Sequence, residues 1–337
     1  MYLRLLILKI NQKVAADFGQ VGHRVVAGLL SFTLAVLVAG CSALSSGSLS
    51  QVNDVPSQAM VADVPFFAQD ELQCGPAALA MALNWSGLSL LPSEVSKEVY
   101  SPNLKGSLQS SLIGAARRHG RVAYPITGGR ALFTELTAGH PVIVLVNLGF
   151  AWLPKWHYAV VIGYDQKKQD IILHSGLNKA EVLSFWTFTN IWKRGHYWGL
   201  LVLPPNQMPE SVEEGRWLEA VAGLENTQQW QAAAVGYAAA TERWHDSFIA
   251  WMGLGHSQYQ LQDFKAAGEA FQQASSIQPR NGMAWNNLAH VLAQQGKFDA
   301  ALDAAQRAVD LGGPLQETYQ QTFADIQQSQ SSLGPQD

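Results

Sequence analysis

The chain has 337 residues, enough for two ordinary domains, and 48% of them are hydrophobic, as in a folded globular protein. Its net charge of −4 at pH 7 gives no sign of the basic face that nucleic-acid binding requires. Only two cysteines occur, Cys41 and Cys74, so at most one disulfide within the chain is conceivable.

Residues 1–40 have the composition of an export signal. Basic residues precede an apolar run, VVAGLLSFTLAVLV, that is short for a membrane span and ends in Val-Ala-Gly before Cys41. Small residues before a cysteine resemble the lipobox of bacterial lipoproteins, which implies cleavage before Cys41 and lipid attachment to its thiol. The alternative is an uncleaved membrane anchor. Residues 41–60 begin with Ser- and Gly-rich sequence and are predicted to be a flexible tether.

The lipoprotein resemblance implies export and a lipid anchor on the periplasmic side of a bacterial envelope, and Ser42 suits the outer membrane. A lipid on Cys41 leaves Cys74 without a disulfide partner. A lone thiol in an oxidising compartment is a liability unless it takes part in chemistry, which directs attention to Cys74.

Residues 61–205 read as a mixed α and β domain. A short strand is predicted at 61–67, and helices at 74–85 and 107–119. Strand-like apolar runs follow at 141–146, 157–164, 170–173 and 197–203. The polar turn DQKKQ joins the second and third of these runs as a hairpin, and PPNQMP closes the domain. Residues 206–213 are predicted to be a linker.

Residues 214–315 repeat with a period of 34. Trp217, Trp251 and Trp285 keep this spacing, and so do four further series of small and aromatic positions. The pattern resembles the TPR family, which implies an all-α solenoid of three repeats, at about 214–247, 248–281 and 282–315. Residues 316–329 are predicted to form a polar capping helix, and residues 330–337 a disordered tail.

Cys74 opens the helix CGPAALAMALNW, with Pro76 in the first turn, where proline is tolerated. The free N–H groups and partial positive charge of a helix N-terminus favour a thiolate. Gly75 allows a substrate carbonyl to come close to the backbone, and the N–H of Cys74 is a candidate donor to an oxyanion. A buried core thiol is the alternative for Cys74.

His157 stands at the mouth of the strand HYAVVIGY, where it is placed to face a helix N-terminus across a cleft. Paired with a thiol, an imidazole serves first as base and then as acid. Trp152 and Trp156 lie just before this histidine, and they are candidates either for the lining of a substrate cleft or for the core.

These segments resemble the papain-like cysteine peptidases of the bacteriocin-leader-processing type, over about residues 61–205. The family pattern is a Gln, a Cys-Gly-Pro-Ala run that opens a helix, and His-Tyr before a strand that ends in Gly-Tyr-Asp. The resemblance implies an α+β papain-like fold with Cys74 as nucleophile, His157 as general base and acid, and Gln69 as oxyanion donor. The family's Gln commonly stands six residues before the Cys and here stands five; Gln73, next to the Cys, fits the pattern less well than Gln69.

The third catalytic residue departs from the family, which has Asp-Pro at the end of the strand after the histidine strand. Here that place reads LHSGLN and contains no Asp. Asn178 is the candidate to orient the imidazole, as an Asn does in papain. Asp165 is expected at the far end of the sheet, and a dyad with a weak orienting residue is the alternative.

The histidines outside this site show no metal-ligand spacing, and no phosphate loop or serine-hydrolase elbow is present, so neither a metal nor a cofactor is expected. We therefore expect an envelope-anchored cysteine peptidase that cleaves peptide or isopeptide bonds. Its TPR repeats would recruit a protein partner or substrate on their concave face. Two alternatives stay open: a degenerate peptidase fold that serves as an assembly scaffold, and a peptidase that acts on stem peptides of the cell wall.

Overall fold

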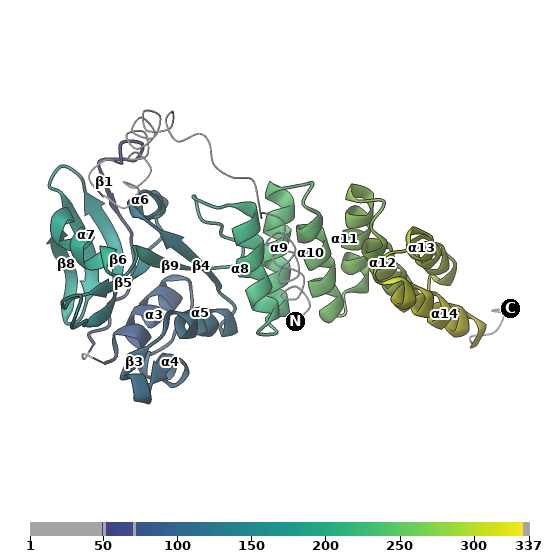
Figure 1. Ribbon diagram of the computed structural model, residues 1–337, viewed down its shortest axis with the longest axis horizontal. Helices are drawn as coiled ribbons and strands as arrows, with labels where there is room; N and C mark the ends of the chain where they lie inside the picture. Colours follow the sequence, from purple (N-terminus) through teal and green to yellow (C-terminus); the bar gives the residue numbers. More distant parts are fainter. Residues whose placement is uncertain (1–48, 50–51, 70–71, 333–337) are drawn as a thin grey trace, which may run out of the picture. The chain divides into compact units, whose positions relative to one another are not determined.

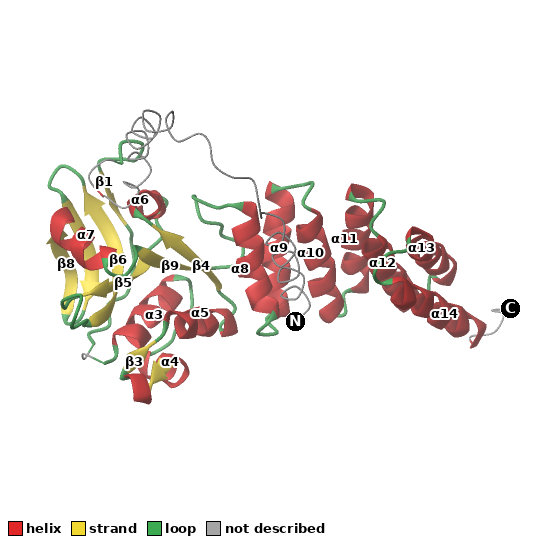
Figure 2. Cartoon of the chain, in the orientation of Figure 1, coloured by secondary structure: helices red, strands yellow, loops and turns green. Residues whose placement is uncertain are grey.

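The computed structural model describes residues 49, 52–69 and 72–332 (Figure 1). A sheet-containing domain is followed by a run of helices, as predicted (Figure 2). The predicted signal segment and Cys41 lie outside the described residues. In the described part of the chain, no helix is long and apolar enough to cross a membrane.

The first domain is built on one antiparallel sheet. Within the described residues this sheet has seven strands, in the order β4-β9-β5-β6-β7-β8, and β1 pairs with the end of β6. The strands are β1 (Gln58–Met60), β4 (Val122–Thr127), β5 (Val142–Asn147), β6 (Trp156–Asp165), β7 (Asp170–Ser175), β8 (Asn178–Ser184) and β9 (Trp198–Leu203). A separate small hairpin is formed by β2 (Tyr100–Ser101) and β3 (Gly106–Ser107), around the 3-10 turn Pro102–Leu104.

Helices cover both faces of the sheet. They are α3 (Cys74–Trp85), α4 (Pro92–Val99), α5 (Gln109–Arg118), α6 (Gly129–Thr137) and α7 (Phe185–Lys193). Helices α3 and α5 lie on one face, and α6 and α7 on the other (Figure 1). The strands are therefore apolar on both sides: in β6, Tyr158 and Val160 pack under α3, whereas Ala159 and Val161 belong to the opposite core.

The structure confirms the helix at residues 74–85 and the hairpin over DQKKQ. Asp165 pairs with Asp170 across that turn, and its carboxylate accepts hydrogen bonds from the N–H groups of Lys167 and Lys168. Asp165 therefore caps the turn at the far end of β6, away from His157. The prediction of a strand at 61–67 was wrong: the Val61 N–H donates to Ile162 O at 2.7 Å, but Asp63 has a φ of 57° and no strand forms in this stretch.

The segment before residue 61 differs from the predicted tether. Leu49 and Val52 are buried in the core on the α6 face, and residues 58–60 form β1. The Tyr164 hydroxyl donates to Pro56 O at 2.9 Å. The described part of the segment thus packs against the domain, because it carries apolar side chains as well as the serines that dominate its composition.

The second domain is a succession of antiparallel helices. They are α8 (Glu214–Glu225), α9 (Trp230–Arg243), α10 (Phe248–Gln260), α11 (Phe264–Ile277), α12 (Gly282–Gln294), α13 (Phe298–Leu311) and α14 (Gln316–Ser332). Small residues allow the helices to approach closely: a Cβ on Gly255 would lie 2.6 Å from the ring of Phe271. The indole N–H of Trp217 donates to Gly236 O at 3.0 Å, between the two helices of the first pair.

The predicted linker is fixed to the first domain by a buried carboxylate. Glu135, on α6, is fully buried and accepts hydrogen bonds from the N–H of Ser211 at 2.8 Å, its hydroxyl at 2.6 Å, and His140 Nδ1 at 2.8 Å. Next to it, Tyr124 OH accepts from the N–H of Glu213 at 3.3 Å. One hydrophobic core continues from the sheet into α8, so residues 206–213 are a packed junction.

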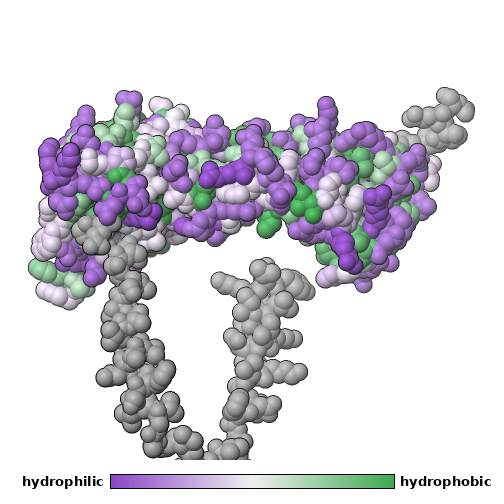
Figure 3. Space-filling view, turned by 90° about the horizontal axis from the view of Figure 1, so that it is seen from above, coloured by the Kyte–Doolittle hydropathy of each residue, from purple (hydrophilic) through white to green (hydrophobic). Residues whose placement is uncertain are grey.

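The molecular surface carries both hydrophilic and hydrophobic side chains. Figure 3 shows one face, on which hydrophilic side chains predominate and hydrophobic ones gather in separate patches. Exposed apolar side chains are most informative where they flank a pocket.

Candidate active site

Cys74 is the first residue of α3, and its thiol is buried, with 7% of the residue exposed. The helix forms here because Ala and Leu dominate its sequence and Pro76 fits the first turn. Gly75 is required by packing: a Cβ there would lie 2.5 Å from Ser107 Oγ, on β3. The β2–β3 hairpin therefore lies directly against the start of the nucleophile helix.

Two opposing effects act on the thiol. Burial is the larger and raises the pKa of Cys74 above its ordinary value, because a thiolate loses solvation there. Hydrogen bonds from the backbone N–H groups of Tyr158, Gly75 and Cys74 itself lower the pKa, but by less. The bond from Tyr158 places the sulfur against the peptide group that follows His157.

His157 lies at the start of β6 and is held by a serine. Its Nε2 is 3.0 Å from Ser175 Oγ, at the end of β7. Burial lowers the pKa of His157 to about 4, and the charge of Lys155 adds to this effect. The imidazole is therefore neutral at physiological pH, since Ser175 offers a hydroxyl where a carboxylate would stabilise the imidazolium.

Gln69 joins the nucleophile to the turn after Ser175. With its amide oriented to satisfy both neighbours, the side-chain nitrogen donates to Cys74 O at 3.2 Å and the oxygen accepts from the N–H of Gly176 at 3.2 Å. The backbone N–H of Gln69 also donates to Gly176 O at 3.2 Å. The Gln69 side chain thus bonds to the backbone of Cys74 and Gly176, whereas the Gln73 side chain accepts from Ser96 Oγ. The role of Gln69 as oxyanion donor stays a prediction.

The structure thus gathers three of the predicted residues, Cys74, His157 and Gln69. Between the described Cys74 and His157 side chains there is no direct hydrogen bond, and Nδ1 of the ring has no hydrogen-bond partner in the described part of the chain. Nδ1 is therefore the nitrogen left to take a proton from the thiol. Hydrogen bonds in an unliganded active site often shorten only when substrate binds.

The prediction for Asn178 needs a correction. Asn178 is exposed at the start of β8 and pairs with Ser175 in the ladder, and Ser175 is the residue that contacts the imidazole. The ladder between β6 and β7 shifts register between Val161 and Gly163, so that Val160 pairs with His174 and Ser175 falls on the same face of the sheet as His157. The sequence signal was its position, because Ser175 stands at the end of the strand that follows the histidine strand.

Two pockets lie at the site. The first, here called the thiol pocket, is lined by Cys74, Ser107 and Tyr158 and has a volume of about 650 Å³. The second, the imidazole pocket, is lined by His157, Ser175 and Gln69 and has a volume of about 480 Å³. Trp156 and Lys155 line both pockets, so the two hollows adjoin along this edge of β6.

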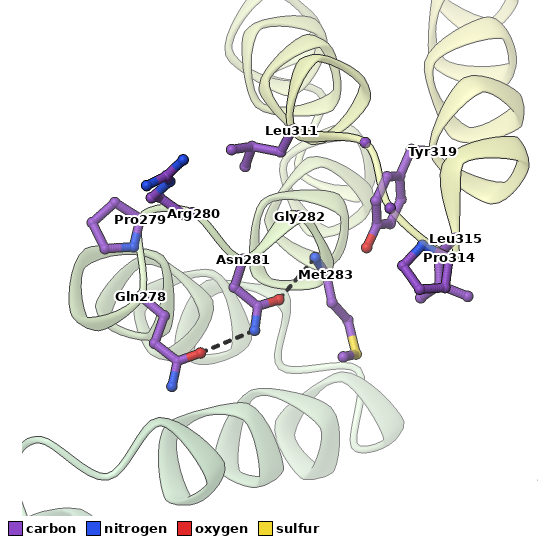
Figure 4. Close-up of a pocket in the computed structure, with 12 residues that line it drawn as sticks. Gln278, Pro279, Arg280, Asn281, Gly282, Met283, Leu311, Pro314, Leu315 and Tyr319 are labelled. Atoms are coloured by element: carbon purple, nitrogen blue, oxygen red, sulfur yellow. Dashed lines mark hydrogen bonds between the residues drawn. The ribbon is translucent and has the colours of Figure 1, made fainter. Parts of the chain in front are cut away.

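A third hollow, of about 760 Å³, lies among the C-terminal helices (Figure 4). The α11–α12 loop and the α13–α14 loop form its sides, with Tyr319 of α14 between them. Arg280 is the one charged residue of its lining, and no nucleophile or base lines it. Over the described residues, no group of histidine, cysteine, aspartate or glutamate side chains is arranged to hold a metal ion.

Comparison with known proteins agrees with this division of the chain. Residues 61–197 match the Peptidase C39-like family, and residues 223–278 and 255–314 match the tetratricopeptide repeat. A search of curated proteins found no match.

Solved structures similar to this chain fall into the same two groups. A C39-like peptidase from Bacillus anthracis is 18% identical, with 44% of this chain and 98% of that one covered and a TM-score of 0.38. The peptidase domain of Streptococcus ComA, a bifunctional ABC transporter of a quorum-sensing pathway, is 22% identical, with 42% and 99% covered and a TM-score of 0.35. The Yersinia enterocolitica type III secretion chaperone SycD, with a peptide of the translocator YopD, is 13% identical, with 36% and 98% covered and a TM-score of 0.34.

The two family matches fall on the two domains that the strands and helices define, and the first of them contains Cys74 and His157. Residues 61–197 therefore form a C39-like peptidase domain, and tetratricopeptide repeats follow it between residues 223 and 314.

Proposed function

We propose that this protein is a cysteine peptidase that cleaves peptide or isopeptide bonds, with Cys74 as nucleophile. The observation that carries the proposal is that three structural features surround Cys74. They are the N-terminus of α3, the Gln69 amide, and the strand that bears His157 with its partner Ser175. A buried thiol that served packing alone would need none of these polar neighbours.

The reaction follows from these positions. His157 Nδ1 takes the thiol proton as the Cys74 sulfur attacks the substrate carbonyl. The N–H of Cys74 and the free hydrogen of the Gln69 amide donate to the oxyanion. His157 then gives its proton to the leaving amine, and a thioester remains on Cys74. In the second half, His157 activates water, and hydrolysis releases the acid and restores the thiol.

Ionisation sets the form of this mechanism. Burial raises the pKa of Cys74 and lowers that of His157 to about 4, so the resting pair is thiol and neutral imidazole. The proton must then move as the sulfur attacks, with His157 as a general base, because a preformed thiolate–imidazolium pair is scarce.

We further propose that the chain is lipid-anchored at Cys41 on the periplasmic side of the envelope, and that the TPR repeats recruit a protein partner or substrate. The Val-Ala-Gly-Cys41 sequence supports the first statement. The match of residues 223–314 to tetratricopeptide repeats supports the second, since solenoids of this kind offer extended binding surfaces.

The rival function is a scaffold that kept the peptidase fold without its chemistry. Two observations favour it: Ser175 stands where a carboxylate would orient and charge the imidazole, and no hydrogen bond joins the described Cys74 and His157 side chains. A scaffold would be expected to bind its partner equally well with Cys74→Ala.

Two thiol probes separate these functions. A peptidyl vinyl sulfone needs a proton donor for the carbanion that forms when sulfur adds, whereas iodoacetamide needs none. We expect His157→Ala to slow vinyl sulfone labelling of Cys74 by about 100-fold or more, the usual size of a general-acid contribution. Iodoacetamide labelling should change only a few-fold. If both probes slow equally, or neither changes, His157 is not a proton donor at this site.

A further inference from the structure

The loop between β5 and β6, residues 148–155, holds large apolar side chains in solvent. Phe150, Trp152 and Leu153 are 63%, 79% and 61% exposed. The rings of Phe150 and Trp152 are stacked, with centroids 5.7 Å apart and planes inclined by 9°. Several adjoining exposed apolar side chains indicate an interaction site, whereas a single exposed apolar residue does not.

The loop has a defined conformation. Its ends are joined by the hydrogen bond from the Leu148 N–H to Lys155 O at 2.9 Å. The buried Asn147 side chain accepts from the N–H groups of Gly149 and Lys155, both at 2.9 Å. Arg194, after α7, donates to Asn147 O at 3.3 Å and to Gly149 O. The aromatic pair is therefore presented on a preorganised support, which reduces the entropy lost when a ligand binds.

The base of this loop forms a wall of the active site. Leu148 lines the imidazole pocket and Pro154 lines the thiol pocket, while Trp156 lines both. A chain that crosses the reacting groups therefore passes along the loop.

Exposed leucines continue the apolar surface away from the loop. Leu177, in the β7–β8 turn, lines the imidazole pocket, and Leu72, Leu104 and Leu108 line the thiol pocket. Both ends of the cleft thus offer apolar contacts around a small number of polar groups, as in sites that bind side chains of the same character.

We propose that loop 148–155 and the two pockets bind an extended substrate segment with aromatic or bulky aliphatic side chains close to the bond that is cut. The inference rests on the proposed function for its occupant: a peptide carbonyl attacked by Cys74 and served by His157 lies where the thiol pocket meets the imidazole pocket, beside Trp156. A lipid bilayer is the other surface that exposed tryptophan suits, but a bilayer does not enter the pockets that the base of the loop lines.

The test measures binding in the full chain carrying Cys74→Ala, so that no cleavage occurs. The probes are two fluorescein-labelled decapeptides of glycine and serine, identical except that one carries two phenylalanines where the other carries serines. Fluorescence anisotropy gives the two dissociation constants. The loop variant is Phe150→Ser with Trp152→Ser, and the matched control is Trp186→Ser, which removes a tryptophan that is 78% exposed on α7 and lines neither pocket.

We expect the phenylalanine peptide to bind at least about tenfold more tightly than the serine peptide, the size that partial burial of one aromatic ring supplies. The loop variant should reduce this ratio to about threefold or less, and Trp186→Ser should leave it unchanged. Equal binding of the two peptides, or a ratio that survives the loop variant, would overturn the inference.

Sedimentation with vesicles of phosphatidylethanolamine and phosphatidylglycerol tests in parallel whether the loop binds a lipid bilayer. Loss of vesicle binding in the loop variant, without discrimination between the peptides, would assign the loop to a membrane and overturn the inference as well. Because these assays need no thiol chemistry, they are independent of the vinyl sulfone test. Peptide discrimination without His157-dependent labelling would leave the binding site in place and remove the peptidase function.

Discussion

Ser175→Asp is expected to convert the resting site from a neutral pair into one that holds a measurable population of thiolate and imidazolium. In the wild-type protein His157 Nε2 lies 3.0 Å from a hydroxyl, which carries no charge to offset an imidazolium. A carboxylate at the same position would lie within the distance at which opposite charges raise a histidine pKa by about 1–3.

The magnitude follows from the two pKa values. That of His157 is about 4 and that of Cys74 lies above its ordinary value of 9.0, so the two differ by about 5 or more. Fewer than about one molecule in 10⁵ then holds the charged pair, and the carboxylate would raise that fraction by about 10- to 1,000-fold. At pH 5 an imidazole with a pKa of about 4 is protonated in about a tenth of the molecules, and one with a pKa raised by about 1–3 in about half to nearly all of them. The charged pair forms only in those molecules, so alkylation of Ser175→Asp at pH 5 should exceed that of the wild type by about five- to tenfold.

The assay is the rate of iodoacetamide addition to Cys74, followed by mass spectrometry between pH 4.5 and 9.5. In the wild type the rate should fall about tenfold for each pH unit below 9, as for a thiol with no partner. In Ser175→Asp the gain over the wild type should be largest between about pH 5 and 7, where the raised histidine pKa falls. Ser175→Asn is the matched control, because it has the size of the aspartate without its charge.

The reasoning is refuted if Ser175→Asp folds with an unchanged thermal midpoint and still follows the wild-type rate profile. It is equally refuted if Ser175→Asn produces the same gain in rate, because a gain without charge would come from altered packing around His157.

Three further predictions concern packing and pH. Gly75→Ala should lower the free energy of unfolding by about 1–3 kcal/mol in urea titrations, since its methyl would lie 2.5 Å from Ser107 Oγ, and adding Ser107→Gly should restore most of it; no loss would contradict the close contact. Glu135→Gln should cost about 3 kcal/mol or more by the same measurement, because it removes the buried charge that accepts from Ser211, and a loss below about 1 kcal/mol would show that the junction is not held there. The pKa of His157 is lowered on folding to about 4, so its contribution to stability is present above about pH 6.5 and is lost as the pH falls toward 4. The thermal midpoint should therefore fall more steeply in the wild type than in His157→Asn over this interval, and parallel curves would argue against a buried neutral ring.

The features that sequence predicted best are those set by neighbouring residues. The helix at 74–85 follows from Pro76 in its first turn and an unbroken run of good helix formers. The TPR repeats could be predicted because the same residue types recur every 34 positions from one repeat to the next. Cys74, His157 and Gln69 could be proposed as candidates because each stands in a distinctive local sequence.

The features that were missed depend on contacts between distant residues. Ser175 faces His157 because the β6–β7 ladder shifts register, and a register shift leaves no mark in local composition. The packed junction depends on a hydrogen bond between Glu135 and Ser211, which are far apart in sequence. The polar composition of residues 206–213 therefore predicted a linker. The stretch around Val52 was read from its serines, although buried apolar residues decide its packing.

The central claim is that Cys74 performs peptide hydrolysis with His157. The most direct measurement is cleavage of a defined peptide mixture by the full chain, followed by mass spectrometry, with purified wall stem peptides tested beside peptides from digested proteins. The account predicts new termini with the wild type, none with Cys74→Ala, and a rate at least about 100-fold lower with His157→Ala. Cleavage of one mixture alone would also identify the substrate class. Cleavage that persists in Cys74→Ala, or a wild type that leaves both mixtures intact, would contradict the account and favour the scaffold.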